Sequence, residues 1–204
     1  MKILLVNGSP HQDGTTARAL KEVEKVILQA GFETEWFHLG TAPIRGCIAC
    51  RACSKLDHCA FDDDPCNTLI EMAKEADGFV FGSPVYYASI NGAFGAVLDR
   101  AFYSASEYFR FKPAAGVVCC RRGGDASAFD RLNKYFTINQ MPVVSSQYWN
   151  DVHGHNALQA EGDEEGMQTM RTLGRNLVWL VESIAKAGLD KPAKEKRIAT
   201  NFIR

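Results

Sequence analysis

The sequence predicts an α/β fold in which a five-stranded parallel sheet is covered by helices on both faces. Short apolar runs alternate five times with segments of helical periodicity, which is typical of this class. The runs are apolar at nearly every position, as expected for parallel strands buried on both faces. With 204 residues, of which 46% are hydrophobic and 23% charged, the chain can bury a full core as one domain, 1–204.

The elements of the first half are predicted in order. The run KILLVN at 2–7 ends at Gly8 and is the first strand, and the helix at 15–30 carries an apolar stripe and ends before Gly31. ETEWFHL at 33–39 is the second strand. A helix at 65–76 begins with Pro65, and GFVFGSP at 78–84 is the third strand.

The second half repeats the alternation. A helix rich in small residues is expected at 90–105, a strand at 114–120, a helix at 126–136 and a fifth strand at 141–149. The last helix spans roughly 163–187, and its buried face is marked by Met167, Met170, Leu177, Val181 and Ile184. Right-handed crossovers between parallel strands leave few topologies, and five strands suit the flavodoxin-like order 2-1-3-4-5.

Three loops are expected to meet at the carboxyl edge of this sheet, where open α/β sheets bind ligands. The first loop, NGSPHQDGTT, joins a strand directly to a helix, so its hydroxyls and free N–H groups suit a phosphate monoester. It lacks both G-x-x-x-x-G-K-[ST] and G-x-G-x-x-G, which disfavours the corresponding nucleotide and dinucleotide sites.

The other two loops add an aromatic element and a positive one. GSPVYYASING brings Tyr86 and Tyr87, whose rings could flank a planar ligand, and CRRGGD brings Arg121 and two glycines. Each loop alone is compatible with a purely structural role as a helix cap, surface aromatics or an exposed turn. Together they describe a site for flavin mononucleotide (FMN).

These segments resemble the NAD(P)H-dependent FMN reductase group of flavodoxin-like proteins, particularly its iron–sulfur flavoprotein branch. The resemblance covers most of the first ~125 residues in family order and includes the segment GCIACRACSKLDHC. It implies a homodimer or homotetramer with the flavin near a subunit boundary, and the helix that begins near Asn91 commonly contributes to that boundary. It implies that FMN is bound by Ser9, Pro10, His11, Gly14, Thr15, Thr16, Pro84, Val85, Tyr86, Tyr87, Arg121 and Gly123.

A cysteine-rich loop at about 44–66 carries the second candidate site. Cys47, Cys50, Cys53 and Cys59 are spaced C-x2-C-x2-C-x5-C, and four thiolates at this spacing can ligate a [4Fe–4S] cluster. Free thiols, an adventitious disulfide and a zinc site remain alternatives. Nearby Arg51, Lys55 and His58 are expected to lower the pKa values of the thiols. Cys66, Cys119 and Cys120 lie outside the motif.

The functional prediction is an oxidoreductase in which FMN takes electrons from NADH or NADPH. It would pass them to a quinone, a flavin, an azo compound or an iron–sulfur acceptor. An electron carrier with no substrate of its own is the alternative, and a zinc-stabilised interaction module is a third hypothesis. No catalytic residue is assigned. A short-chain dehydrogenase is disfavoured although Tyr108 and Lys112 fit Y-x-x-x-K, because the glycine-rich dinucleotide loop is absent.

The net charge and the lack of targeting signals limit the expected partners and location of the protein. The net charge of −1 gives no basic excess for nucleic acid or an anionic membrane. No signal peptide or membrane span is recognisable, so we expect a cytoplasmic protein, where a tight cysteine cluster more often binds metal or does redox chemistry than forms disulfides.

Overall fold

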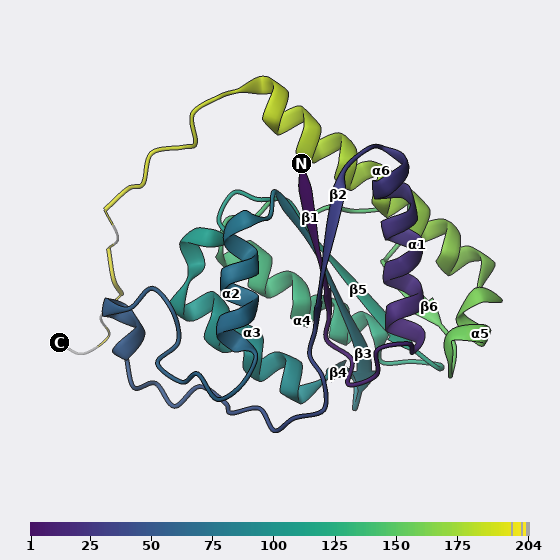
Figure 1. Ribbon diagram of the computed structural model, residues 1–204, viewed down its shortest axis with the longest axis horizontal. Helices are drawn as coiled ribbons and strands as arrows, with labels where there is room; N and C mark the ends of the chain where they lie inside the picture. Colours follow the sequence, from purple (N-terminus) through teal and green to yellow (C-terminus); the bar gives the residue numbers. More distant parts are fainter. Residues whose placement is uncertain (197, 201, 203–204) are drawn as a thin grey trace.

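The computed structural model describes residues 1–196, 198–200 and 202, and it contains the predicted sheet (Figure 1). Five parallel strands lie side by side in the order β2 (Glu33–His38), β1 (Lys2–Asn7), β3 (Gly78–Tyr86), β5 (Ala114–Cys120) and β6 (Asp151–His153). A two-residue strand, β4 (Ser89–Ile90), pairs antiparallel with β3. Counting only the parallel strands, the order is 2-1-3-4-5, which confirms the predicted fold class.

Helices cover both faces of the sheet and bury a separate core on each. One face carries α1 (Thr15–Gln29), α5 (Ala157–Glu161) and α6 (Glu164–Ala187). The other carries α2 (Cys66–Glu75), α3 (Gly92–Ser104) and α4 (Asp125–Ile138), as Figure 1 shows. Alternate residues of β1 point to the two cores: Ile3 and Leu5 pack beneath α1 and α6, and Leu4 and Val6 beneath the other helices. This double burial is why the strands are apolar throughout.

The third strand is longer than predicted. The expected strand stopped at 84, but β3 continues to Tyr86, so Val85 and Tyr86 lie in a strand and not in a loop. Pro84 is aligned with Cys119 of β5, and Val85 pairs with Ile90 of β4. The strand continues because the chain turns back on itself as a hairpin, which supplies a new partner beyond the end of the main sheet.

The fifth strand was placed wrongly at 141–149. Val143 makes only an isolated bridge to Ala114, after which the chain leaves the sheet and exposes Tyr148 and Trp149. Pairing resumes at β6, and the Asn150 side chain spans the gap by donating to the carbonyl of Gly116 at 3.0 Å. The apolar run therefore marked the approach to the sheet, while the paired residues Asp151 and His153 are polar.

The remaining differences are small. The 24-residue helix α6 matches the prediction, although Ile184 is exposed at 44% and does not belong to the buried face. Helix α5 and two 3-10 turns, η1 (Ala52–Lys55) and η2 (Ser106–Tyr108), were not predicted because each is too short to show periodicity. In the described part of the chain, no helix is both long enough and apolar enough to cross a membrane.

Candidate functional site

The first loop at the carboxyl edge is a folded turn that leads into α1. The Ser9 amide donates to Asn7 Oδ1 at 3.0 Å, and the His11 amide donates to Ser9 Oγ at 3.1 Å. Gly14 is the N-cap residue of α1 and has no capping side chain, so N–H groups at the helix start are left for another acceptor. A phosphate is a fitting acceptor, because these groups lie at the positive end of the helix.

The hydroxyls predicted to bind phosphate are not equally accessible. Thr15 is partly exposed, and its hydroxyl donates to the carbonyl of Gly154 at 3.3 Å. Thr16 is only 2% exposed, and its side chain faces the thiol of Cys119 beneath the loop. Thr16 therefore offers a ligand its backbone amide more readily than its side chain, while the Ser9 hydroxyl, which accepts from the His11 amide, still has its own proton to donate.

A close approach between Gly8 and α3 joins the first loop to the second. A Cβ on Gly8 would lie 2.2 Å from Cδ1 of Phe94, so only glycine fits there. The Asn91 side chain donates to the carbonyl of Gly8 at 2.9 Å, and the Asn91 amide donates to Ser83 Oγ at 3.0 Å. Asn91 also caps α3 by accepting from the Ala93 amide. One asparagine thus fixes both loops to the start of α3.

The two tyrosines lie at the tip of the β3–β4 hairpin. Tyr87 and Ala88 have φ angles of 49° and 57°, the pair of left-handed residues that a tight type I′ turn requires. Such angles strain residues other than glycine. The Tyr87 side chain is fully exposed, and Tyr86 is 44% exposed. The turn therefore presents both rings on the surface, without packing them into the core.

The third loop packs against this hairpin. Gly124 has φ 90°, and a Cβ there would lie 2.9 Å from Cα of Ala88. Arg121, Arg122 and Gly123 are exposed. The structure thus brings together at one edge the first loop, the hairpin and the 121–124 loop, as the sequence predicts.

A cluster of proton-holding groups borders this edge and was not predicted. Donor atoms of Cys120, Asp125 and His153 lie within 4.8 Å of one another. Burial, together with a hydrogen bond to Asp125, raises the pKa of Asp151 to about 6. Burial also raises the pKa of the Cys120 thiol to about 11. Asp151 can therefore hold a proton closer to neutral pH than an ordinary carboxyl group does. Sequence reasoning missed this cluster because Asp151 and His153 fall just beyond the strand that was predicted.

The cysteine loop runs from the end of β2 over the helices α2 and α3. All seven cysteines lie in the described part of the chain and carry free thiols. The four cysteines of the motif line one common cavity, which is closed on its inner side by Arg100. The four cysteines thus share one cavity, but no three of their sulfur atoms lie within 4.8 Å of one another, so the [4Fe–4S] site stays a prediction.

The four thiols differ in their surroundings. Cys47 and Cys50 are exposed, Cys53 is partly exposed, and Cys59 is 8% exposed and packs into the core beside α3. The expectation that basic neighbours lower the thiol pKa values is wrong for Cys53. Burial and the neighbouring thiols raise the pKa of Cys53.

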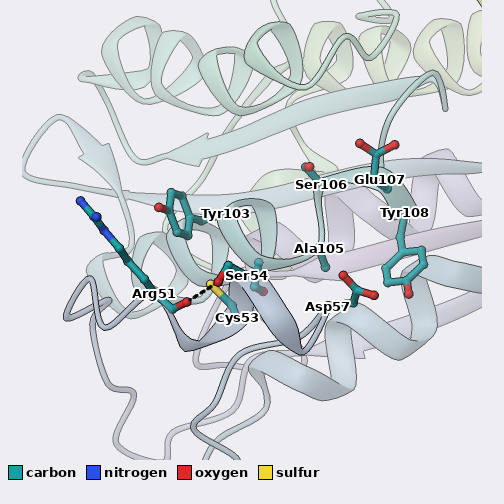
Figure 2. A pocket seen from close by; sticks show the side chains of 10 residues that line it. Arg51, Cys53, Ser54, Asp57, Tyr103, Ala105, Ser106, Glu107 and Tyr108 are labelled. Atoms are coloured by element: carbon teal, nitrogen blue, oxygen red, sulfur yellow. Dashed lines mark hydrogen bonds between the residues drawn. The ribbon is translucent and has the colours of Figure 1, made fainter. Parts of the chain in front are cut away.

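A larger open pocket adjoins the cysteine loop. Its volume is about 490 Å³, within the usual size of small-molecule sites. Figure 2 shows Arg51, Cys53 and Asp57 of the loop on one side and Tyr103, Glu107 and Tyr108 on the other. The Ser54 hydroxyl donates to the carbonyl of Arg51 at 2.9 Å and holds the turn that presents Cys53.

Three side chains that the sequence analysis left outside these sites have structural surroundings. Cys66 is fully buried, with its thiol 3.8 Å from the carbonyl of Val97, and burial raises its pKa to about 12. Cys119 belongs to the core beneath α1. Lys112 donates to the carbonyls of Ala73 and Lys74 at the end of α2. Lys112 thus has a structural contact in place of the dehydrogenase role that Y-x-x-x-K would give it.

Comparison with known proteins assigns the family. A family model described as NADPH-dependent FMN reductase matches residues 1–156, more than half of the chain. The chain belongs to this family. Its relatives include an iron–sulfur flavoprotein of Methanocaldococcus jannaschii, 28% identical over 194 residues, which are 91% of this chain and 100% of that protein. An iron–sulfur flavoprotein of Methanosarcina thermophila is 28% identical over 196 residues, 91% of this chain and 98% of that protein.

Solved structures of more distant proteins share the fold. RosB with a bound 8-demethyl-8-formylriboflavin-5'-phosphate superposes with a TM-score of 0.69 at 16% identity, covering 100% of this chain and 94% of RosB. The NADH:FMN oxidoreductase EMOB in its apo form gives a TM-score of 0.62 at 17% identity, covering 89% of each chain. At these identities the likeness concerns the fold alone.

Proposed function

We propose that the protein is an FMN-dependent oxidoreductase that takes electrons from NADPH or NADH and passes them to a separate acceptor. The observation that carries this proposal is the meeting of three loops at the carboxyl edge: a helix start with free N–H groups, a hairpin that presents two tyrosines, and an exposed loop with Arg121 and Gly123. Membership of the NADPH-dependent FMN reductase family supports it. Bound FMN would supply hydride and electron chemistry, while the protein binds and orients it.

Ligand binding tests the phosphate assignment. The protein should bind one FMN per chain and bind riboflavin more weakly, since only FMN offers the phosphate. Combining Ser9→Ala with Thr15→Val should weaken FMN by about tenfold, or about 1.4 kcal/mol, and leave riboflavin nearly unchanged. Fluorescence titration measures both ligands. Equal losses for FMN and riboflavin would contradict the assignment, and absence of any flavin binding would overturn the proposed function.

Electron transfer separates an enzyme from a carrier. An enzyme should oxidise NADPH or NADH continuously when a quinone, free flavin or azo dye is supplied, whereas a carrier shows almost no turnover. The open pocket of about 490 Å³ beside Cys53 does not decide between them, because it adjoins the end of α3 at Tyr103 and Ser104, while the start of α3 contacts the first loop.

We also propose that the cysteine loop holds a [4Fe–4S] cluster. The donor set fits, since four free thiols line one cavity. The cavity as it stands has a volume of about 20 Å³, little more than one water needs, so the outer part of the loop must move to admit a cluster. Cys47 and Cys50 lie on an exposed stretch outside any helix or strand, where such movement costs little. A bound cluster would accept and donate single electrons.

Anaerobic reconstitution tests the cluster. About four irons per chain and a broad absorption near 400 nm beyond that of the flavin are expected. Cys59→Ser should abolish this uptake, whereas Cys66→Ser, a control at a buried cysteine outside the motif, should not. Zinc bound in place of iron would favour the alternative of a zinc-stabilised module.

We further propose that the protein is a homodimer or homotetramer in a reducing cytoplasm. Light scattering of the reduced protein measures the number of chains in the assembly.

A further inference from the structure

Arg100 is the most deeply buried charged residue in the described part of the chain. It lies in the middle of α3 and is 2% exposed, and its guanidinium faces the cysteine loop. Its Nε donates to Cys59 Sγ at 3.2 Å, one terminal nitrogen donates to the carbonyl of Arg45 at 3.0 Å, and the other donates to the carbonyl of Phe61 at 3.1 Å. It also forms an ion pair with Asp64.

The partner carboxylate is equally enclosed. The Asp64 side chain is 2% exposed and accepts from the backbone amides of Arg45 and Cys66. Burying both charges costs several kcal/mol each, and an apolar pair of similar volume would often serve stability as well. A core made only for stability would therefore not require this pair, so the loop contacts of Arg100 need another explanation.

Those contacts clamp both ends of the cysteine loop. Arg45 lies just before the segment that contains the four cysteines, and Phe61 lies just after it. The Arg45 guanidinium also stacks over the Phe61 ring at 4.5 Å, which brings the two ends together. Asn67 fixes the same end by accepting from the Cys59 amide and donating to its carbonyl. Cys59 is thus held by several contacts, whereas Cys47 and Cys50 are exposed.

The contact with Cys59 reaches the sulfur atom itself. Hydrogen bonds to cluster sulfurs are among the factors that set the reduction potential of iron–sulfur centres. A donor from a cation stabilises the more negative, reduced form. We propose that Arg100 is a positioning residue that anchors Cys59 as the fixed ligand of the cysteine loop and raises the reduction potential of the cluster bound there. This inference rests on the proposed cluster.

Two variants separate the effect on the sulfur from the effect on folding. Arg100→Lys keeps the charge beside Asp64, but a single ammonium cannot reproduce the fork that reaches Cys59 and both loop ends. Arg100→Met combined with Asp64→Leu removes the ion pair as a whole and leaves no uncompensated buried carboxylate. Arg131→Met, on the exposed side of α4, is the matched control, because Arg131 forms an ion pair with Asp99 away from the loop.

The wild type and the variants are reconstituted anaerobically. We then measure the iron content and the circular dichroism spectrum. A redox titration followed by electron paramagnetic resonance gives the midpoint potential of the cluster. Both Arg100 variants should retain the fold and bind iron. Their midpoint potential should fall by an amount corresponding to about a tenfold change in the reduction equilibrium, about 59 mV for one electron. Their clusters should also be lost in air several times faster. The Arg131→Met protein should match the wild type.

The outcomes separate the two claims. A wild-type protein that takes up no iron overturns the cluster and this role of Arg100 together. Wild-type iron and potential in both variants overturns the role of Arg100 alone. If the variants do not fold, the wild type labelled with 15N-arginine tests the role of Arg100. Pulsed electron paramagnetic resonance of its reduced form should show one arginine nitrogen coupled to the cluster. Absence of that coupling would overturn the inference.

Discussion

Gly8 is the residue where the structure leaves the least freedom. Because a Cβ would lie 2.2 Å from the Phe94 ring, Gly8→Ala must displace either the first loop or α3. We expect a loss of about 1–3 kcal/mol in the free energy of unfolding, together with weaker FMN binding. Urea denaturation and flavin titration measure the two effects. Gly92→Ala, where a Cβ meets nothing within 4 Å, is the control and should change stability little. Adding Phe94→Leu should recover part of the loss, and no recovery would contradict the steric explanation.

A substitution at Tyr87 can test the function of the site with little effect on the stability of the fold. The side chain is fully exposed at the hairpin tip, so Tyr87→Ala should change the free energy of unfolding by no more than about 0.5 kcal/mol. If the ring shapes access to the flavin, turnover or the choice of acceptor should change at least severalfold. Steady-state rates with three chemically different acceptors are the measurement. Unchanged rates with all three would remove Tyr87 from the site.

The role of a site residue could be predicted from the sequence when it depends only on neighbouring residues in the chain. The run of Ser9, Thr15 and Thr16 at a strand-to-helix junction identifies a phosphate-binding loop, but only the fold shows that the Thr16 hydroxyl faces Cys119. Arg100 was not predicted at all, since it reads as an ordinary charged residue within a helix. Its partners, Cys59 and Asp64, are 41 and 36 positions away in the chain, and no local pattern records such a contact.

At the scale of elements, a buried carboxylate joins α1 to α6. Glu22 is 6% exposed and accepts from Arg18 of its own helix at 3.0 Å and from Arg171 of α6 at 2.8 Å. Burial pushes the pKa of Glu22 up, but the hydrogen bonds from Arg171 and Arg18 outweigh it and hold that pKa below its usual value of 4.5. The folded state therefore favours the ionised form.

The pH dependence of stability follows from this sign. A carboxyl whose pKa is lower in the folded state contributes stability that is present above 4.5 and is lost as the pH falls through the folded-state pKa. Glu22→Gln should destabilise by about 1–2 kcal/mol at pH 7, and its difference from the wild type should shrink below pH 4.5. Denaturation at pH 7 and at acidic pH tests this, with exposed Glu33→Gln as the control. A difference that stays constant with pH would contradict the assignment.

Elements with strong periodicity were predicted well, and those without it were not. Helix α6 and strand β1 carry unbroken apolar patterns, so their ends were correct to within about one residue. Strand β6 has only three residues, of which Asp151 and His153 are polar and only Val152 is apolar, and it depends on its partner β5, which only the assembled sheet reveals. The hairpin that extends β3 likewise requires two left-handed residues, Tyr87 and Ala88, which propensity alone would not place there.

At the scale of the whole molecule, α3 connects the two candidate sites. Asn91 at its start binds the carbonyl of Gly8 in the first loop, and Arg100 nine positions later binds Cys59. Nine residues of helix span about 14 Å. A displacement of α3 at Asn91 should therefore also shift Arg100, because interiors are close-packed and transmit strain.

We expect flavin and cluster to affect each other's binding. By thermodynamic linkage, a cluster that changes the Kd for FMN by a given factor must itself be bound more tightly or weakly by the same factor when FMN is present. FMN titrations of the cluster-loaded and cluster-free protein measure this factor, and a severalfold change is expected. Asn91→Ala should reduce it, because it cuts the bond between α3 and the first loop. Identical Kd values for the two forms would show that α3 does not couple the sites.

The anchoring of Cys59 also bears on the order in which the protein is assembled. In many small metalloproteins the chain stays unfolded until the metal arrives, so chelators denature them. Here Cys59 packs into the core beside α3 and accepts a hydrogen bond from Arg100, which pairs with Asp64, so protein contacts of its own hold this ligand in place. Folding would thus come first, and iron would be inserted later from the solvent side, through Cys47 and Cys50. Such a protein should survive repeated removal and reinsertion of its inorganic centre.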